Sequence, residues 1–178
     1  GNLTINLAGA TLNAAAGTVD LNGDFNLSAG TFTAPTANFN ISGSFTLTGG
    51  TFTHSSGTTI FDSTTAGRTI TSGGTSFYNF TFNGAGGEWT LQDNLDIDNN
   101  LTLTAGTLDV SVNNYSITIG GNFTRTGGAF TVRQGTVTFN DRSKSSTITG
   151  SIAFFNFTST TAGKIIFFEA GSTQVIGG

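Results

Sequence analysis

Residues Gly43–Phe61 read GSFTLTGGTFTHSSGTTIF, and this stretch decides the fold. Two short runs, Ser44–Thr48 and Thr51–Thr53, alternate apolar and hydroxyl side chains on either side of a glycine pair. A polar corner at His54–Gly57 follows, and then a third alternating run, Thr58–Phe61. Alternation with a period of two, interrupted by glycines, is typical of strands joined by tight turns. The stretch therefore predicts three short β-strands.

The same pattern recurs along the chain at a spacing of about 20 residues. Two series of apolar residues have this spacing: Leu12, Phe32 and Phe52, and Leu21, Ile41 and Phe61. A longer similarity of about 78 residues links 42–119 to 120–178 and its continuation into 1–41. Frequent glycine and β-branched residues disfavour helix throughout. Short tandem units of strands predict a solenoid, in which each coil packs only on its neighbours. We therefore expect an all-β protein, with 1–178 forming one continuous parallel β-solenoid (β-helix).

Each coil of such a solenoid sends alternate side chains inward, where they stack on the equivalent residues of the next coil. Neighbouring strands lie about 4.8 Å apart, so about nine coils would make a rod roughly 40 Å long. We expect these residues to point inward: Leu12, Leu21, Phe25, Leu27, Phe32, Phe39, Ile41, Phe45, Leu47, Phe52, Phe61, Phe80, Phe82, Leu101, Leu103, Phe123, Phe130, Val137, Phe139 and Phe157.

Composition disfavours several classes of partner. The net charge is −4 and the chain has only six Lys and Arg residues, which are scattered, so we expect no nucleic-acid binding. Isolated basic residues such as Arg125 and Arg133 are expected to serve solubility rather than a partner. No apolar run approaches the roughly 20 residues that span a bilayer, so we expect no membrane insertion. The chain has no Cys and no Met, which suits a long-lived protein outside the cell.

Several runs carry a resemblance to known proteins. NLTLTAGTL (Asn100–Leu108), SITIGGNFT (Ser116–Thr124) and GTVTFN (Gly135–Asn140) resemble the Gly/Thr/Asn-rich tandem repeats of large secreted bacterial surface proteins. Those repeats form adhesin-like or fibre-forming regions. The resemblance implies a repeat architecture and a place outside the cell, and it carries no specific ligand or activity. Contact with a glycan or another surface stays open as a partner. It carries no family site onto any residue of this chain.

Candidate catalytic or metal-binding residues are few. His54 is the only histidine, and its Gly/Ser-rich surroundings predict a solvated corner residue. Asp93, Asp96 and Asp98 form the one acidic cluster, and Asp96 and Asp98 share one face of a strand. Such a pair suits Ca²⁺ or the carboxylates of a polysaccharide-cleaving β-helix, but the glycine-rich nonapeptide of calcium-binding β-rolls is missing. We expect solvated carboxylates, with no catalytic residues, no metal and no cofactor.

Two Thr-X-Thr pairs suggest a different function. Thr31/Thr33 and Thr51/Thr53 lie one coil apart, so their hydroxyl groups are expected to form a flat array. Flat threonine arrays on β-solenoids resemble ice-binding surfaces. The pattern is not kept in other coils, which read Thr11/Asn13, Thr107/Asp109 and Ala129/Thr131. Ice binding therefore stays an alternative, beside carbohydrate binding.

The first and last strands predict self-association. Written end to start, the sequence reads VIGG–GNLT, which is similar to ITIGGNFT at 117–124. The end of one copy is therefore expected to continue into the start of another, either covalently in a longer tandem chain or between separate copies. We favour separate copies that stack head to tail into a filament. The residues expected at this interface are Leu3, Ile5 and Leu7 against Ile165, Phe167, Val175 and Ile176. The alternatives are an adhesin-type carbohydrate- or ice-binding solenoid and, ranked last, a polysaccharide-degrading enzyme.

A second contact surface is expected on the side of the rod. If Tyr78, Phe80 and Phe82 point inward, strict alternation turns Phe77 outward. Phe154 is the corresponding residue of the second long repeat. We therefore expect Phe77 and Phe154 to face outward and to offer a lateral contact between rods.

Overall fold

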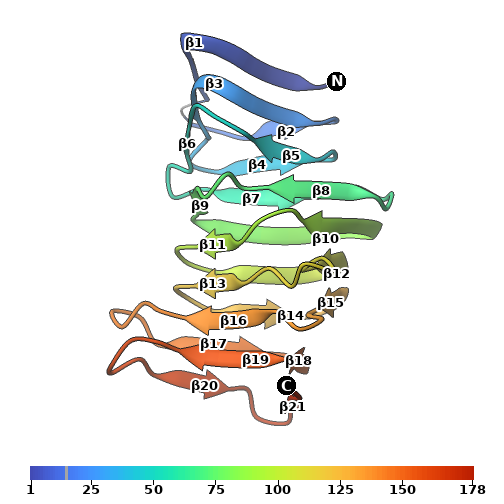
Figure 1. Cartoon of the computed structure of the whole chain (residues 1–178), viewed down its shortest axis with the longest axis vertical. Helices are drawn as coiled ribbons and strands as arrows, with labels where there is room; N and C mark the ends of the chain where they lie inside the picture. The colour runs from blue at the N-terminus through green and yellow to red at the C-terminus, as the bar shows by residue number, and fades with distance from the viewer. Residues whose placement is uncertain (15) are drawn as a thin grey trace.

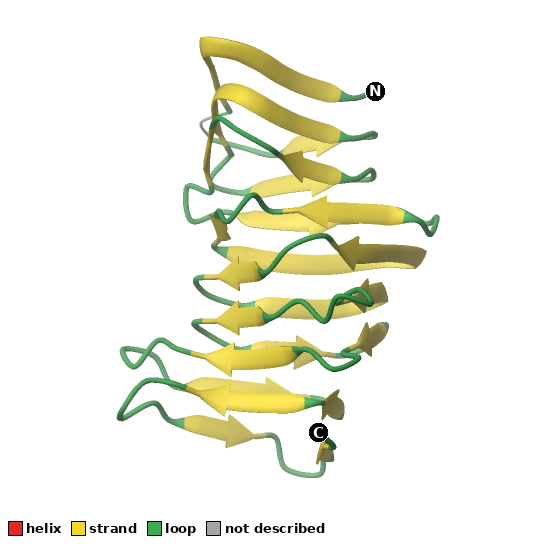
Figure 2. Cartoon of the chain, viewed as in Figure 1, coloured by secondary structure: helices red, strands yellow, loops and turns green. Residues whose placement is uncertain are grey.

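The computed structural model describes residues 1–14 and 16–178 and shows a parallel β-solenoid (Figures 1 and 2). It has about eight stacked coils of about 20 residues each. All strand pairs are parallel, and the described residues contain no helix. Accordingly, no helix in the described part of the chain is long and apolar enough to cross a membrane. The predicted fold class is confirmed.

The strands line three faces of the rod, which we number in the order in which the chain visits them. Face 1 consists of the first part of β1 (Leu3–Asn13), the first part of β3 (Phe25–Thr33), β5 (Phe45–Leu47), β8 (Arg68–Thr71), the last part of β10 (Asn79–Leu91), the last part of β12 (Leu101–Asp109), β15 (Ala129–Thr131), β18 (Ile152–Phe154) and β21 (Gln174–Ile176). Face 2 consists of the last parts of β1 and β3, then β6 (Thr51–Thr53), β9 (Ser76–Phe77), β11 (Leu95–Ile97), β13 (Ile117–Ile119), β16 (Thr136–Phe139) and β19 (Asn156–Ser159). Face 3 consists of β2 (Val19–Leu21), β4 (Asn38–Ile41), β7 (Thr58–Phe61), the first parts of β10 and β12, β14 (Phe123–Arg125), β17 (Ser146–Thr149) and β20 (Ile166–Phe168).

The core is a column of apolar side chains along the axis of the rod. Strands of neighbouring coils pair in register, so that Phe25 lies on Leu3 and under Phe45. Most of the residues predicted to point inward are buried. Phe130 and Phe157 are half-buried and pack against the core. Leu12 keeps the predicted register with Phe32 but is 41% exposed, because no coil of these 178 residues covers β1.

The prediction for Phe77 and Phe154 is wrong, because both rings are buried, with 0% and 2% of their surface exposed. The chain bends at Tyr78 between β9 and β10, and at Phe155 between β18 and β19. A bend at a corner interrupts the alternation, so residues on both sides of it point inward. Phe80 is buried as predicted, and Tyr78 lies at the corner rather than in the core. These two phenylalanines therefore offer no lateral contact.

Corners use glycine for two different reasons. Gly50 has a φ of 74°, and a Cβ added there would lie 2.6 Å from the carbonyl oxygen of Gly30 in the coil beside it. At the predicted corner His54–Gly57, however, the positive φ values belong to Ser55 and Ser56, at 49° and 59°. Gly57 is needed there because a side chain would collide with the carbonyl oxygen of Pro35. Glycine is therefore needed at corners for two reasons: a positive φ at some positions and close approach of a neighbouring coil at others.

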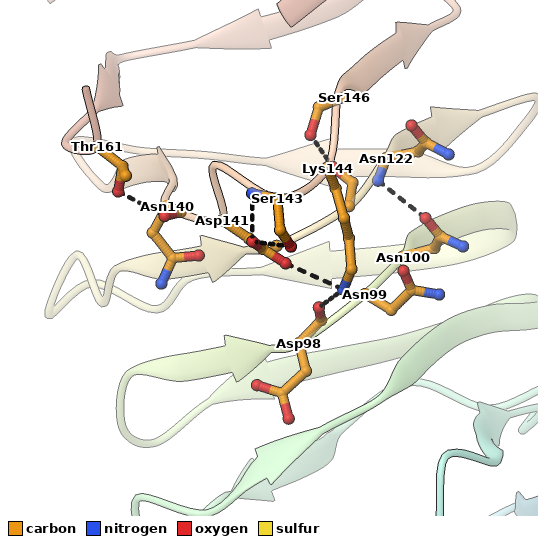
Figure 3. Close-up of polar contacts among 12 residues, drawn as sticks. Asp98, Asn99, Asn100, Asn122, Asn140, Asp141, Ser143, Lys144, Ser146 and Thr161 are labelled. Atoms are coloured by element: carbon orange, nitrogen blue, oxygen red, sulfur yellow. Dashed lines mark hydrogen bonds and ion pairs between the residues drawn. The ribbon is translucent and has the colours of Figure 1, made fainter. Parts of the chain in front are cut away.

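Side chains extend the hydrogen bonding between coils at the corners. The Asp24 N–H donates to Asn2 Oδ1 (2.9 Å), the Ser44 N–H to Asp24 Oδ1 (2.8 Å), and the Thr69 N–H to Ser44 Oγ (3.1 Å). Each acceptor directly precedes the first inward residue of its strand. We call this arrangement the side-chain ladder. A second ladder joins Asn100, Asn122 and Thr147, and Figure 3 shows its step from Asn100 to Asn122.

Candidate functional site

Charged and aromatic side chains gather at the corner between faces 2 and 3, near the middle of the rod. The group consists of His54, Ser76, Tyr78, Asp98 and Lys144, and we call it the Asp98 cluster. These residues come from different coils, and their surface position makes the cluster the first candidate for a functional site. Figure 3 shows its Asp98 and Lys144 side, together with neighbouring polar residues.

His54 and Ser76 both bind the Asp98 carboxylate. His54 Nε2 lies 3.1 Å from Asp98 Oδ2, and Ser76 Oγ donates to the same oxygen at 3.0 Å. The N–H of Ser56 donates to His54 Nδ1 at 2.9 Å. Nδ1 is thus an acceptor, so in neutral His54 the proton sits on Nε2 and points to Asp98. His54 is therefore a half-buried link between coils rather than the solvated corner residue that the sequence predicts.

Lys144 reaches the cluster from the loop 140–145. Its Nζ donates to the backbone carbonyl of Asp98 at 2.7 Å and lies 3.2 Å from Asp141 Oδ2. Figure 3 shows the side chain extended from its loop to Asp98, whose carboxylate points away from Lys144. The Lys144 ammonium also lies 5.8 Å from the centre of the Tyr78 ring. Hydrogen bonds from the side chain and backbone of Ser143 lower the pKa of Asp141 to about 2.

Lys164 fastens the same loop from the other side. Its Nζ donates to the backbone carbonyls of Gly120 (2.8 Å), Asp141 (2.9 Å) and Lys144 (3.0 Å). Partial burial lowers the pKa of Lys164. A single ammonium thus satisfies one carbonyl group at the Gly120 corner and two in the loop 140–145, which fixes this loop to the rod.

The predicted acidic cluster does not form one site. Asp93 accepts the N–H groups of Ser72 (2.8 Å) and Gly73 (2.7 Å) at the corner before β11. Asp98 lies at the opposite end of that strand. Asp96 lies between them and pairs in register with Ser76. Loss of hydration is the main cause that raises the pKa of Asp96, and the negative charge of Asp98 is the second.

The two arginines considered from the sequence bind groups within the rod. Arg133 forms a two-point pair with Asp109, with Nε–Oδ1 and Nη2–Oδ2 distances of 2.6 Å. Asp109 is buried, and the hydrogen bond from Arg133 is the main cause that lowers its pKa. Arg125 donates to the carbonyls of Gly128 (2.7 Å from Nη2) and Ser151 (2.8 Å from Nη1). Both arginines fix turns rather than simply adding solubility.

The chemical capacity of the Asp98 cluster follows from these contacts. The side chains of Asp93, Asp98 and Asp109 each accept hydrogen bonds from the chain itself. Within the described residues no pocket is present, and no three His, Asp or Glu side chains are grouped closely enough to hold a metal ion. The arrangement holds coils and loops together, and sequence reasoning missed it because Lys144 and Lys164 reach it from distant loops.

The threonine pairs form a short array. Thr31 pairs with Thr51, and Thr33 with Thr53, as the sequence predicts. The array continues to Thr11 on one side. On the other side, the next strand of face 2 is β9, which is followed by the bend at Tyr78. The array therefore covers only the first three coils of face 2.

The end coils carry the residues predicted for the head-to-tail interface. Leu3 and Ile5 are largely covered, whereas Leu7 is 69% exposed. At the other end the exposed residues are Ile165, Phe167, Val175 and Ile176, all more than half exposed.

Register decides which side of the end coil these side chains occupy. Phe167 pairs with Thr147 and Val175 with Ala153, so both point outward. Ile176 pairs with buried Phe154, and Phe168 pairs with buried Ile148, so these two lie on the inner side. Phe168 is 52% exposed and was not predicted. The register of the 20-residue repeat would have identified it.

A scan against protein-family models, a search of curated proteins and a search of solved structures each returned no match to this chain.

Proposed function

We propose that this chain is a non-catalytic building block of an extracellular filament or surface fibre, in which copies stack head to tail. The observation that carries the proposal is the exposure of apolar residues at both ends of the rod. Leu12 at one end and Phe168 and Ile176 at the other lie on the inner side of their coils, yet each is 41–59% exposed. Elsewhere in the rod the corresponding positions are buried by the next coil.

The free strand edges support the same contact. The outer edges of β1 and β2 at one end, and of β19, β20 and β21 at the other, have no neighbouring strand among the described residues. Exposed edges of this kind pair readily with other strands. Because all strands of the rod are parallel, its two ends are complementary in the same way as any two adjacent coils. A head-to-tail contact of this kind is heterologous and propagates as an open filament.

The gain from covering the ends is substantial. Burying a large apolar side chain fully gains about 1.5–3 kcal/mol, so covering half of one gains on the order of 1 kcal/mol. Several such residues, together with backbone hydrogen bonds on three faces, offset the entropy lost on association. The resemblance to Gly/Thr/Asn-rich secreted repeats, and the lack of Cys and Met, support a place outside the cell.

Charged substitutions at the ends test the proposal. We expect the 178-residue chain to form long particles in light scattering and sedimentation. Leu12→Asp and Phe168→Asp should each leave mostly monomer, because the charge would be buried between coils. Val112→Asp is the matched control, since Val112 is 75% exposed but lies in a turn along the side of the rod. A wild-type chain that stays monomeric at high concentration, or assembly lost equally in all three variants, would overturn the proposal.

A further inference from the structure

The two ends of the rod do not match face to face. Face 1 continues to β21, which lies on β18, whereas face 2 ends at β19 and face 3 at β20. The end of the rod is therefore a step one strand high (Figure 1). At the other end, the first coil starts on face 1 with β1. Stacking two copies with equal faces aligned would place β1 on β21 and leave a gap of one coil, about 4.8 Å, above β19 and β20.

We propose that consecutive copies are rotated by one face, so that β1 of the second copy pairs in parallel with the free edge of β19. The last part of that β1 then lies on β20, and β2 of the second copy lies on β21. All three faces continue without a gap, as in the interior of the rod. This inference rests on the proposed head-to-tail function and specifies the register of its contact.

The position of Gly178 supports this register. A Cβ added to Gly178 would lie 2.8 Å from the carbonyl oxygen of Phe155 and 3.0 Å from Asn156 Oδ1. Gly178 thus lies directly on the residues that lead into β19. A strand of the second copy that starts next to Gly178 would therefore lie over β19 and not over β21.

The residues of β1 and β19 match in this register. Asn2 precedes inward Leu3 as Asn156 precedes inward Phe157. In the side-chain ladder, Asn2 Oδ1 accepts the N–H of Asp24, so Asn156 Oδ1 is placed to accept the N–H of Asn2 in the second copy. The segment between the two parts of β1 (6–10) has five residues and the segment between β19 and β20 (160–165) has six, so the corners that follow are similar in length.

The interior of the chain contains a precedent for this step. In the similarity of about 78 residues, β21 corresponds to β11. The strand after β11 is β12, which starts Leu101-Thr102 directly after Asn100 and lies one face further on. Residues 2–4 have the same sequence, Asn-Leu-Thr. The proposed register therefore places β1 after β21 as β12 follows β11.

Cysteine cross-linking distinguishes the three possible rotations, because the chain has no native Cys. Thr4 points outward at the centre of the strand pair, and its expected neighbour in the second copy is Thr158. Equal faces would instead bring Thr4 to Val175, and the opposite rotation would bring it to Phe167. Register partners on adjacent strands lie about 4.8 Å apart, which is within the Cα–Cα range of a disulfide.

Three double variants are compared under mild oxidation: Thr4→Cys with Thr158→Cys, with Val175→Cys, and with Phe167→Cys. We expect the first to give a reducible ladder of multimers, with at least about tenfold more product than the other two. A ladder from either other pair overturns the register but leaves the filament standing. Filaments in light scattering with no cross-link in any variant also overturn the register. Monomers with no cross-link in any variant overturn the filament itself.

Discussion

Asp109 is the residue at which burial and charge conflict most directly. Its carboxylate is 4% exposed and carries two hydrogen bonds from Arg133 and one from the N–H of Ser111. A buried carboxylate without such partners would shift its pKa upward and lose its charge. The lowered pKa of Asp109 shows that the partners outweigh the loss of hydration. Asp109 is the last residue of β12, and Arg133 lies in the turn after β15 of the adjacent coil, so the pair also joins these two coils.

The pair predicts a pH-dependent effect of Arg133→Gln. Because the folded pKa of Asp109 is below its unfolded value, the stability that it contributes is fully present above about pH 4 and is lost as the pH falls through the folded pKa. In Arg133→Gln the buried carboxylate loses its cation and its pKa rises. We expect the melting temperature to fall most at pH 7, and the deficit to shrink between about pH 5 and pH 3.

Circular dichroism melts at several pH values measure this effect. Arg142→Gln is the control, since Arg142 is exposed in the loop 140–145. It should cause a small deficit that hardly changes with pH. A deficit for Arg133→Gln that is the same at every pH would contradict the described role of Asp109.

At the scale of elements, strands were more predictable than corners. The stretch Gly43–Phe61 predicted β5, β6 and β7 nearly to the residue, because alternation reports directly which side chains face the core. Corners follow no such period. The bend at Tyr78 resets the alternation, which is why the orientation of Phe77 was predicted wrongly.

The Asp98 cluster could not be predicted for a related reason. Its members His54, Asp98 and Lys144 are far apart in sequence and meet only because the coils stack in one register. The position of Lys144 also depends on the path of the loop 140–145, which the repeat does not encode. The apolar strands at the ends, in contrast, could be identified from the sequence because they belong to the repeat, although exposed Phe168 was missed. Their role as an interface stays a prediction.

The corrected register of the aromatic coil makes Phe77→Ala more damaging than Tyr78→Ala. Phe77 is fully buried, and its ring contacts Phe45, Phe52 and Phe80. Truncating a buried Phe costs about 3–5 kcal/mol. Tyr78 lies at the corner and stacks on His54, so we expect its loss to cost clearly less.

Urea unfolding followed by tryptophan fluorescence measures both variants. The only tryptophan, Trp89, is fully buried and reports loss of the core. Equal effects, or a larger effect of Tyr78→Ala, would contradict the register of β9 and β10.

At the scale of the whole molecule, the proposed filament would extend the rod by the same contacts that hold its coils together. Each coil is covered by its neighbours, and the end coils present inner apolar residues and free strand edges. The hydrogen bonds that Lys144, Lys164 and Arg133 form between coils lie along the sides of the rod and leave both ends accessible. The proposed head-to-tail contact therefore rests on the two ends.

Electron microscopy of the purified 178-residue chain tests this central claim most directly. We expect unbranched filaments one solenoid wide, with an axial rise of about 40 Å per subunit from the coil spacing of about 4.8 Å. Because each subunit is rotated by one face, the filament repeats only after three subunits, about 120 Å along its axis. Monomeric rods at high concentration, or rods joined side by side rather than end to end, would contradict the account.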